Sequence, residues 1–314
     1  MICPVAADWD GDGDLDLVCG NTAGNLGWFE NLDGGDPPKW AAPRLLEVDG
    51  RPLRIMAGPN GSIQGPCEAK WGYTQPSVAD WDGDGKLDIL VNSIWGKVVW
   101  YRNVGEKGAP RLSPAAPIEV EWPGEPPRPA WTWWKPKPGE LATEWRTTPC
   151  VVDWNGDRLP DLIMLDHEGF LVFFERVESN GQRRLLPGRR VFYSTTVSAY
   201  DSKHLPKNAL PGLLRLNDGR AGASGRRTLC VADWDGDGGL DLLVDSRNAN
   251  VLRHEGFQDG RTLLRDLGPV SDRRLAGHST CPTTVDWDRD GRPDLVLGAE
   301  DGRLYYLKNP GGSK

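Results

Sequence analysis

The sequence lacks the apolar spacing of an amphipathic helix, and no apolar stretch approaches the roughly 20 residues of a membrane-spanning helix. His is scarce, at four of 314 residues, and neither a His-rich metal motif nor a nucleophile-elbow motif occurs. These absences argue against a helical protein and against the hydrolases that carry such motifs. The 39 Gly and 26 Pro instead favour a β-fold with many tight turns.

One acidic segment occurs five times. The copies are ADWDGDGDLDLV (7–18), ADWDGDGKLDIL (79–90), VDWNGDRLPDLI (152–163), ADWDGDGGLDLL (232–243) and VDWDRDGRPDLV (285–296). Their first Asp residues are 72, 73, 80 and 53 residues apart, and a short apolar segment follows each copy. Each unit therefore predicts a strand, an acidic loop, a second strand, a tight turn and a third strand. Fourth strands are predicted at 44–50, 117–122, 189–195 and, from a weaker pattern, 264–270.

The five acidic loops, numbered 1 to 5 along the chain, have the oxygen pattern of a cation-binding loop. With the first Asp as position 1, side-chain oxygens fall at positions 1, 3, 5 and 9, and position 7 offers a carbonyl. Gly at position 6 permits a sharp turn. Six or seven oxygens in loose geometry suit calcium. The alternative is a metal-free Asp/Gly hairpin turn, which five copies with one internal spacing disfavour.

The predicted metal ligands follow from this numbering. They are Asp8, Asp10, Asp12, Asp14 and Asp16 in loop 1, Asp80, Asp82, Asp84, Lys86 and Asp88 in loop 2, Asp153, Asn155, Asp157, Leu159 and Asp161 in loop 3, Asp233, Asp235, Asp237, Gly239 and Asp241 in loop 4, and Asp286, Asp288, Asp290, Arg292 and Asp294 in loop 5. Loop 3 departs most, because Asn155 removes a charge and Arg158 replaces the turn Gly. We expect about four to five calcium sites, with loop 3 the weakest or empty.

These loops resemble the FG-GAP/VCBS repeats of the integrin alpha-subunit propeller and of many secreted bacterial proteins, over essentially the whole chain. The resemblance implies an all-β fold, a β-propeller in which each repeat forms one four-stranded blade. It also implies calcium in the loops between strands 1 and 2 of each blade. Function stays open, because such propellers serve in adhesion, in carbohydrate binding and as polysaccharide lyases.

The repeats divide the chain into five blades within one domain, although a degenerate blade within the long gaps would raise that number. The expected blades are about 4–49, 76–121, 149–196, 228–272 and 282–309, and the insertions between them are 50–75, 122–148, 197–227 and 273–280. The last repeat stops after three strands, so either the ring closes without a borrowed strand or the chain is part of a longer protein. Calcium loops of this kind suggest a secreted, periplasmic or cell-surface protein, although no signal peptide is visible.

The six cysteines form no CxxC pair. Cys3 and Cys281 lie five residues before their loops, and Cys150 and Cys230 lie three before theirs. The alternation of side chains along a strand places both offsets on one face. Buried small side chains near the propeller axis are the favoured interpretation, and disulfides are the alternative.

The charge outside the loops is basic. Setting aside the 20 Asp residues of the loops leaves 25 acidic residues against 37 Lys and Arg, a balance of about +12. A cationic surface attracts anionic partners, and acidic polysaccharide fits a propeller of this kind. No nucleic-acid module is present. The alternative is that these basic residues form an ordinary solvated surface.

The insertions and the turns between strands 2 and 3 are expected on the propeller face opposite the acidic loops. Insertion 122–148 is rich in Trp, and Trp95 lies in such a turn. A Trp ring suits stacking on a sugar; the alternative is a Pro/Trp-rich flap packed on the propeller. The predicted substrate-binding residues are Lys70, Trp95, Trp131, Trp133, Trp134, Trp145, His167, Arg226 and Arg247.

A possible catalytic group lies at the start of the blades. Tyr73, Arg146, Arg226 and Ser279 stand seven residues before the first Asp of their loops, with Arg227 and His278 beside them. Arg could neutralise a uronate carboxylate while His or Tyr moves the proton of a β-elimination. The predicted catalytic residues are therefore Tyr73, His278, Arg146 and Arg227. A glycoside hydrolase would need two apposed carboxylates, and no spacing marks such a pair.

Two classes of function remain from the sequence. One is a calcium-stabilised propeller that binds an acidic polysaccharide and cleaves it by β-elimination. The other is a non-catalytic propeller for carbohydrate or protein binding, as in adhesion. The first is favoured by the Tyr/His/Arg group, and the second by the lack of an established catalytic motif.

Overall fold

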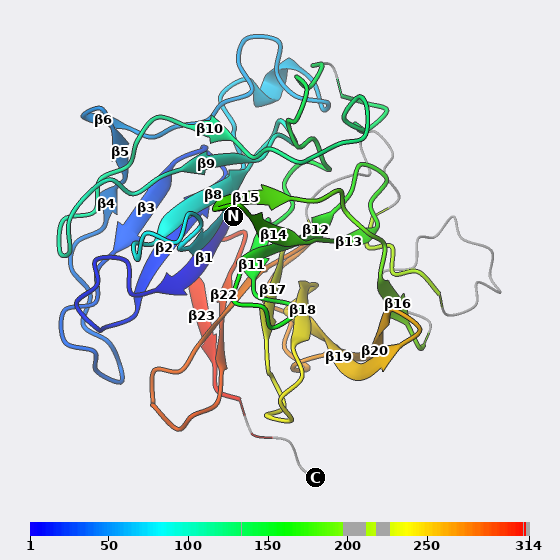
Figure 1. Ribbon diagram of the computed structural model, residues 1–314. Helices are drawn as coiled ribbons and strands as arrows, with labels where there is room; N and C mark the ends of the chain where they lie inside the picture. Colours follow the sequence, from blue (N-terminus) through cyan, green and yellow to red (C-terminus); the bar gives the residue numbers. More distant parts are fainter. Residues whose placement is uncertain (133, 197–211, 218–226, 310, 312–314) are drawn as a thin grey trace.

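Twenty-three β-strands and one short 3₁₀ helix, η1 (Pro66–Glu68), form the regular structure of the described residues. The computed structural model describes residues 1–132, 134–196, 212–217, 227–309 and 311. The strands form five blades arranged around an axis (Figure 1). This arrangement confirms the all-β, five-bladed propeller predicted from the repeats.

In each blade an inner, a second and a third strand pair antiparallel in chain order. The inner strands are β1 (Ile2–Ala7), β7 (Gln75–Ala79), β11 (Cys150–Val152), β17 (Leu229–Ala232) and β21 (Cys281–Val285). The second strands are β2 (Asp16–Asn21), β8 (Asp88–Asn92), β12 (Asp161–Leu165), β18 (Asp241–Asp245) and β22 (Asp294–Gly298). The third strands are β3 (Leu26–Phe29), β9 (Val99–Tyr101), β13 (Leu171–Phe174), β19 (Ala249–Gln258) and β23 (Leu304–Leu307).

The ring closes between blades 5 and 1 by direct contact of their inner strands. Each inner strand contacts the next, in the order β1, β7, β11, β17, β21 and back to β1. Across this last joint the Ala6 N–H donates to Thr283 Oγ1 at 3.3 Å. Gly298 has no room for a side chain, because a Cβ there would lie 2.0 Å from the carbonyl oxygen of Ile2. Among the described residues, blade 1 therefore contains only N-terminal strands and blade 5 only C-terminal strands, with no strand exchanged between them.

The outer edges of the blades differ from one another. Blades 1, 2 and 4 have a fourth strand, which is β4 (Arg44–Leu45), β10 (Ala116–Pro117) and β20 (Arg261–Pro269), respectively. Two short hairpins are formed by β5 (Glu47–Val48) with β6 (Arg51–Pro52) and by β14 (Arg176–Ser179) with β15 (Gln182–Leu185). The last strand, β16 (Phe192–Ser194), lies at an edge. Blade 5 has three strands among the described residues.

The fourth strand predicted at 189–195 for blade 3 is divided between two blades. Arg189 forms an isolated bridge to Phe173 of blade 3. The following strand, β16, instead pairs in parallel with β20 of blade 4. The reason is the length of the β19–β20 hairpin. Its strands have ten and nine residues, so the outer edge of β20 is available for pairing with β16.

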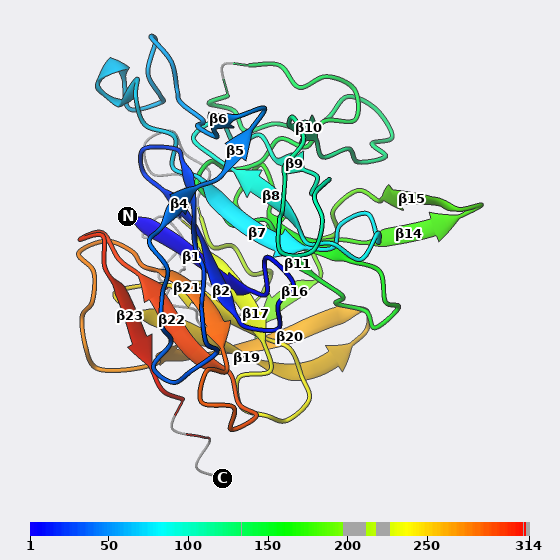
Figure 2. The same ribbon diagram turned by 90° about the vertical axis from the view of Figure 1, so that its left-hand side faces the viewer.

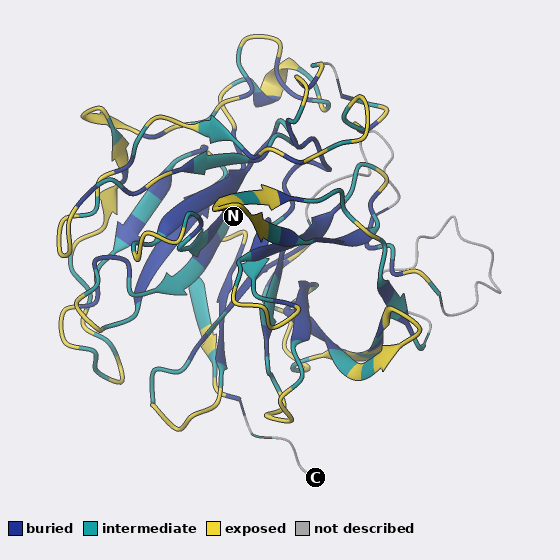
Figure 3. Ribbon diagram, in the orientation of Figure 1, coloured by how far each residue is buried: buried dark blue, intermediate teal, exposed yellow. Residues whose placement is uncertain are grey.

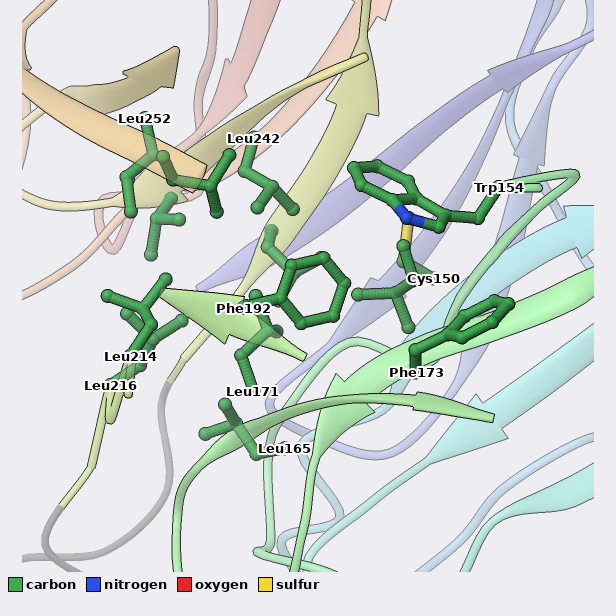
Figure 4. Packing of buried hydrophobic residues seen from close by; sticks show 14 residues of the cluster. Cys150, Trp154, Leu165, Leu171, Phe173, Phe192, Leu214, Leu216, Leu242 and Leu252 are labelled. Carbon is green, nitrogen blue, oxygen red and sulfur yellow. The ribbon is translucent and has the colours of Figure 1, made fainter. Parts of the chain in front are cut away.

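The hydrophobic core lies between neighbouring blades. In each blade the first five residues of the second strand are buried. Figure 3 shows burial concentrated toward the middle of the ring. One cluster joins blades 3 and 4, where Trp154 and Phe173 belong to the same group as Leu242 and Leu252 (Figure 4). Cys150 belongs to this cluster, and the six cysteines are free.

The Asp at position 9 of each loop is the first residue of the second strand and connects the loop with the third strand, and we call these five residues the hub aspartates. They are Asp16, Asp88, Asp161, Asp241 and Asp294, each at most 1% exposed. In every blade their Oδ1 accepts a backbone N–H at 2.6–2.8 Å, from the second residue beyond the third strand in blades 1, 2, 3 and 5 and from His254 within β19 in blade 4. In loops 2, 3 and 4 the Oδ2 also accepts the N–H of the Trp at position 2. The hub therefore joins the loop, the second strand and the third strand without any metal.

The hub bonds predict a large cost for Asp241→Ala in EDTA. The variant removes the acceptor of the partly buried N–H groups of Trp234 and His254, which should lower the free energy of unfolding by about 2–3 kcal/mol. Asp235→Ala, which removes an exposed carboxylate of the same loop, is the matched control and should cost less than about 1 kcal/mol. Urea unfolding measures both values; equal losses would contradict the role of the hub.

Candidate functional site

The acidic loops bring carboxylates together at one end of the molecule. Loops 4 and 5 lie at the bottom of Figures 1 and 2, and the insertions 50–75 and 122–148 lie at the top. Ligand atoms of three carboxylates lie within 4.8 Å of one another in four loops. These sets are Asp8, Asp10 and Asp12; Asp80, Asp82 and Asp88; Asp233, Asp235 and Asp241; and Asp286, Asp288 and Asp290. Such clusters have the hard oxygen donors that calcium prefers.

Two observations test whether these loops suit a cation. Asp8 Oδ1 and Asp233 Oδ1 are buried and have no hydrogen-bond partner, which leaves a negative oxygen in loops 1 and 4 uncompensated. Burial also raises the pKa of Asp16, Asp88, Asp161 and Asp241 to about 6. A bound cation would offset both costs, because it favours the ionised carboxylates. The residues present therefore fit a divalent cation.

The turn at position 6 follows the expected geometry in every loop. Its N–H donates to the first Asp of the loop at 2.8–3.1 Å. The backbone there is left-handed, with φ from 71° to 107°, which Gly adopts freely. In loop 3 this residue is Arg158, with φ 71°, and among the described residues loop 3 gives no cluster of three acids. Both features agree with loop 3 as the weakest site, which stays a prediction.

The opposite end of the propeller contains a buried ion pair between two insertions. Arg146 Nη2 donates to Glu68 Oε1 at 2.9 Å and to Oε2 at 3.0 Å, and both side chains are nearly inaccessible. Tyr73 Oη donates to the same carboxylate at 2.9 Å, and Ser62 Oγ also donates to it. The Arg146 guanidinium lies 3.2 Å from the ring centroid of Tyr73 and 3.8 Å from that of Trp145. Insertions from successive blades are thus tied together at this cluster.

Three tryptophans pack against this cluster and a fourth, Trp134, bonds to one of them; we call Trp71, Trp95, Trp131 and Trp134 the aromatic platform. Trp71 is 41% exposed and packs edge-on against Tyr73, and Trp131 packs against Trp145 in the same way. Trp95 Nε1 donates to the Met56 carbonyl at 3.0 Å, and Trp134 Nε1 donates to the Trp95 carbonyl at 2.7 Å. The polar edges of two indoles are therefore fixed by backbone, which holds their flat faces in place.

The structure brings some of the predicted site residues together and leaves others apart. Tyr73, Arg146, Trp95, Trp131, Trp134 and Trp145 belong to the cluster or the platform. His278 instead contacts Glu300 at 3.0 Å, and Arg227 contacts Asp245 at 3.3 Å. Lys70 and Arg247 are exposed and His167 is half-buried. Trp133 and Arg226 lie outside the described residues.

Two members of this site were not assigned to it from the sequence. Glu68 is not among the site residues predicted from the sequence, because nothing in the sequence relates it to Arg146, 78 residues away. Trp71 lies two residues before Tyr73 in the same insertion. Because Trp71 lies between the predicted site residues Lys70 and Tyr73, the sequence contains a signal that places it on the same surface.

The buried pair predicts strong coupling between Glu68 and Arg146. Glu68→Ala should lower the free energy of unfolding by about 3–5 kcal/mol, because Arg146 would keep a buried charge without its carboxylate. The double variant Glu68→Leu/Arg146→Met should cost less than the sum of Glu68→Leu and Arg146→Met. A double-mutant cycle by urea unfolding measures this coupling; additive losses would contradict it.

Comparison with known proteins places the chain in a family. The model for the FG-GAP-like repeat matches residues 8–91 and 80–164, half of the chain. No curated protein matches the sequence. A solved structure of an Agrocybe aegerita lectin that recognises non-reducing terminal N-acetylglucosamine is 15% identical, with a TM-score of 0.39, over 98% of this chain and 80% of that chain. None of the described helices is long and apolar enough to cross a membrane. The matched repeats and the five blades show that the chain belongs to the FG-GAP-like repeat family of β-propellers.

Proposed function

We propose that this protein is a calcium-stabilised propeller that binds a glycan on the aromatic platform. The observation that carries the proposal is the set of indole rings packed against the buried group of Tyr73, Trp145 and Arg146. A sugar ring stacks well on an indole face that is already fixed, because little conformational entropy is lost on binding. Trp71 offers the more exposed face, and Trp95 is half-buried.

The charge around the platform favours an acidic glycan. The insertions 50–75 and 122–148 contain seven basic and four acidic residues. Three of the four acids, Glu68, Glu140 and Glu144, are buried, so the exposed charge is more positive than the totals suggest. Arg54 and Lys70 are exposed beside the platform, and the Arg54 guanidinium donates to the carbonyls of Ala23 and Lys70. A uronate carboxylate would be attracted to this rim.

The buried cluster favours binding over β-elimination. The Arg146 guanidinium contacts Glu68 and has no exposed surface, so a uronate could reach it only by displacing this carboxylate. Tyr73 Oη donates to the same Glu68. His278 is exposed and pairs with Glu300. These residues therefore act in our proposal as supports of the binding surface, and catalysis by them is the alternative.

Glycan binding predicts a loss of affinity in Trp71→Ala. Loss of one stacked ring should weaken acidic and neutral ligands alike by about tenfold, since stacking does not depend on ligand charge. Arg54→Gln should weaken uronate ligands alone. A glycan array followed by calorimetry measures these affinities, with Phe257→Ala as the control, because Phe257 is a 68% exposed aromatic on the β19–β20 hairpin.

The same ligands distinguish the classes of function. Incubation with uronic-acid polysaccharides should release no unsaturated ends, measured by ultraviolet absorbance. Their release by the wild type and its loss in His278→Ala would instead establish β-elimination. If no glycan on the array binds, or if Trp71→Ala binds as the wild type does, the platform is not a glycan site and a protein partner becomes the better hypothesis.

Calcium binding predicts a stability that depends on chelation. EDTA should lower the melting temperature, because a ligand that binds only the folded state adds about 2.7 kcal/mol per site at one hundred times its dissociation constant. Asp12→Ala should remove more of this calcium-dependent gain than Asp157→Ala, since only Asp12 belongs to a carboxylate cluster. An unchanged melting curve in EDTA, with no metal found by elemental analysis, would contradict the proposal.

A further inference from the structure

One position beside the acidic loops carries charges of opposite sign in different blades. It is the residue directly before the one whose N–H binds the hub aspartate, and we call it the flanking position. The flanking residues are Glu30, Arg102, Glu175, Arg253 and Lys308 in blades 1 to 5. Because the hub bond fixes the backbone next to the flanking residue against the loop, each flanking side chain starts from an equivalent place.

In blades 2 and 5 the flanking residue is a cation that reaches into its own loop. Arg102 Nε lies 2.6 Å from Asp82 Oδ2, and Arg102 Nη2 lies 3.0 Å from Asp84 Oδ2. Lys308 Nζ contacts Asp288 and lies 3.7 Å from Asp290. In both loops these carboxylates occupy positions 3 and 5. The same two positions are thus compensated by the protein's own charge.

The other flanking residues do not compensate their loops. Glu30 pairs with Arg44 at 2.7 Å, and Glu175 pairs with Arg189 at 2.8 Å. Arg253 is a cation, but it contacts Glu255 at 3.4 Å. Within the residues that the structure describes, positions 3 and 5 of loops 1 and 4 have no basic side chain in ion-pair contact; the one contact in loop 1 is at position 7, where Arg289 Nη2 lies 3.7 Å from Asp14 Oδ1. These are also the loops in which the first Asp has a buried oxygen without a partner.

We propose that Arg102 and Lys308 are built-in counter-cations that divide the four carboxylate clusters into two classes of cation site. Loops 1 and 4 then bind calcium tightly and depend on it for stability. Loops 2 and 5 bind it more weakly, because an incoming divalent ion meets a positive charge already held by the same carboxylates. Blade 2, which carries Trp95 of the aromatic platform, is therefore stabilised without calcium. This inference rests on the calcium binding proposed above.

The test is calcium titration by calorimetry after removal of metal with EDTA. The wild type should show about two tight and two weaker sites. Arg102→Gln should convert one weak site into a tight one, with a dissociation constant lower by about tenfold, and should lower the melting temperature in EDTA. Lys308→Gln should do the same for loop 5, which keeps the test valid if Arg102→Gln fails to fold.

Arg253→Gln is the matched control, because it removes the same kind of charge from the same position of blade 4, where no loop carboxylate is contacted. It should leave the titration unchanged. A single class of sites in the wild type, unaffected by Arg102→Gln and Lys308→Gln, would overturn the inference while calcium binding stands. If neither the wild type nor any variant binds calcium, the calcium part of the proposed function fails, and the inference fails with it.

Discussion

The hub aspartate is the interaction on which each blade depends. Its carboxylate accepts a backbone N–H from within or just beyond the third strand in all five blades, and in three of them also the N–H of the Trp at position 2. It is also the first residue of the second strand, which is buried along its length. Burial of such a charge is costly. Its hydrogen bonds and the cation proposed in the loop would together offset this cost.

Repetition of this unit separates the two ends of the propeller. The acidic loops connect inner and second strands at one end, and the turns between second and third strands lie at the other. The insertions dock on those turns: the Ile55 N–H donates to the Gly24 carbonyl, and the Thr143 N–H donates to the Gly96 carbonyl. The end with the acidic loops can therefore stabilise the blades while the opposite end varies its surface, because no residue has to serve both.

The sequence predicts the repeated part of this protein well and the connections between repeats poorly. The turn at position 6 follows from the spacing within the acidic segment, and the fold class and blade number follow from its five copies. The pairing of β16 with blade 4 and the contact of Glu68 with Arg146 join segments far apart in the chain. Such contacts depend on how blades pack together, and the spacing of residues within one repeat contains no signal for them. The direction of Arg102 toward its loop likewise depends on how the third strand packs against the loop.

The cluster beneath the aromatic platform results from the way successive blades join. Tyr73 and Arg146 occupy the same repeat position, seven residues before the first Asp of their loops, and both have a left-handed backbone, with φ of 49° and 59°. In each case the N–H donates to a carbonyl of the preceding blade, Thr22 for Tyr73 and Ser93 for Arg146. A non-glycine residue keeps this conformation only when its surroundings fix it. Blades 2 and 3 therefore share this backbone turn although their side chains at the position differ, whereas Ser279, at the same position before loop 5, is not left-handed. Here a tyrosine and an arginine from successive blades reach the same carboxylate, so the joint between blades 2 and 3 also forms the floor of the proposed binding surface.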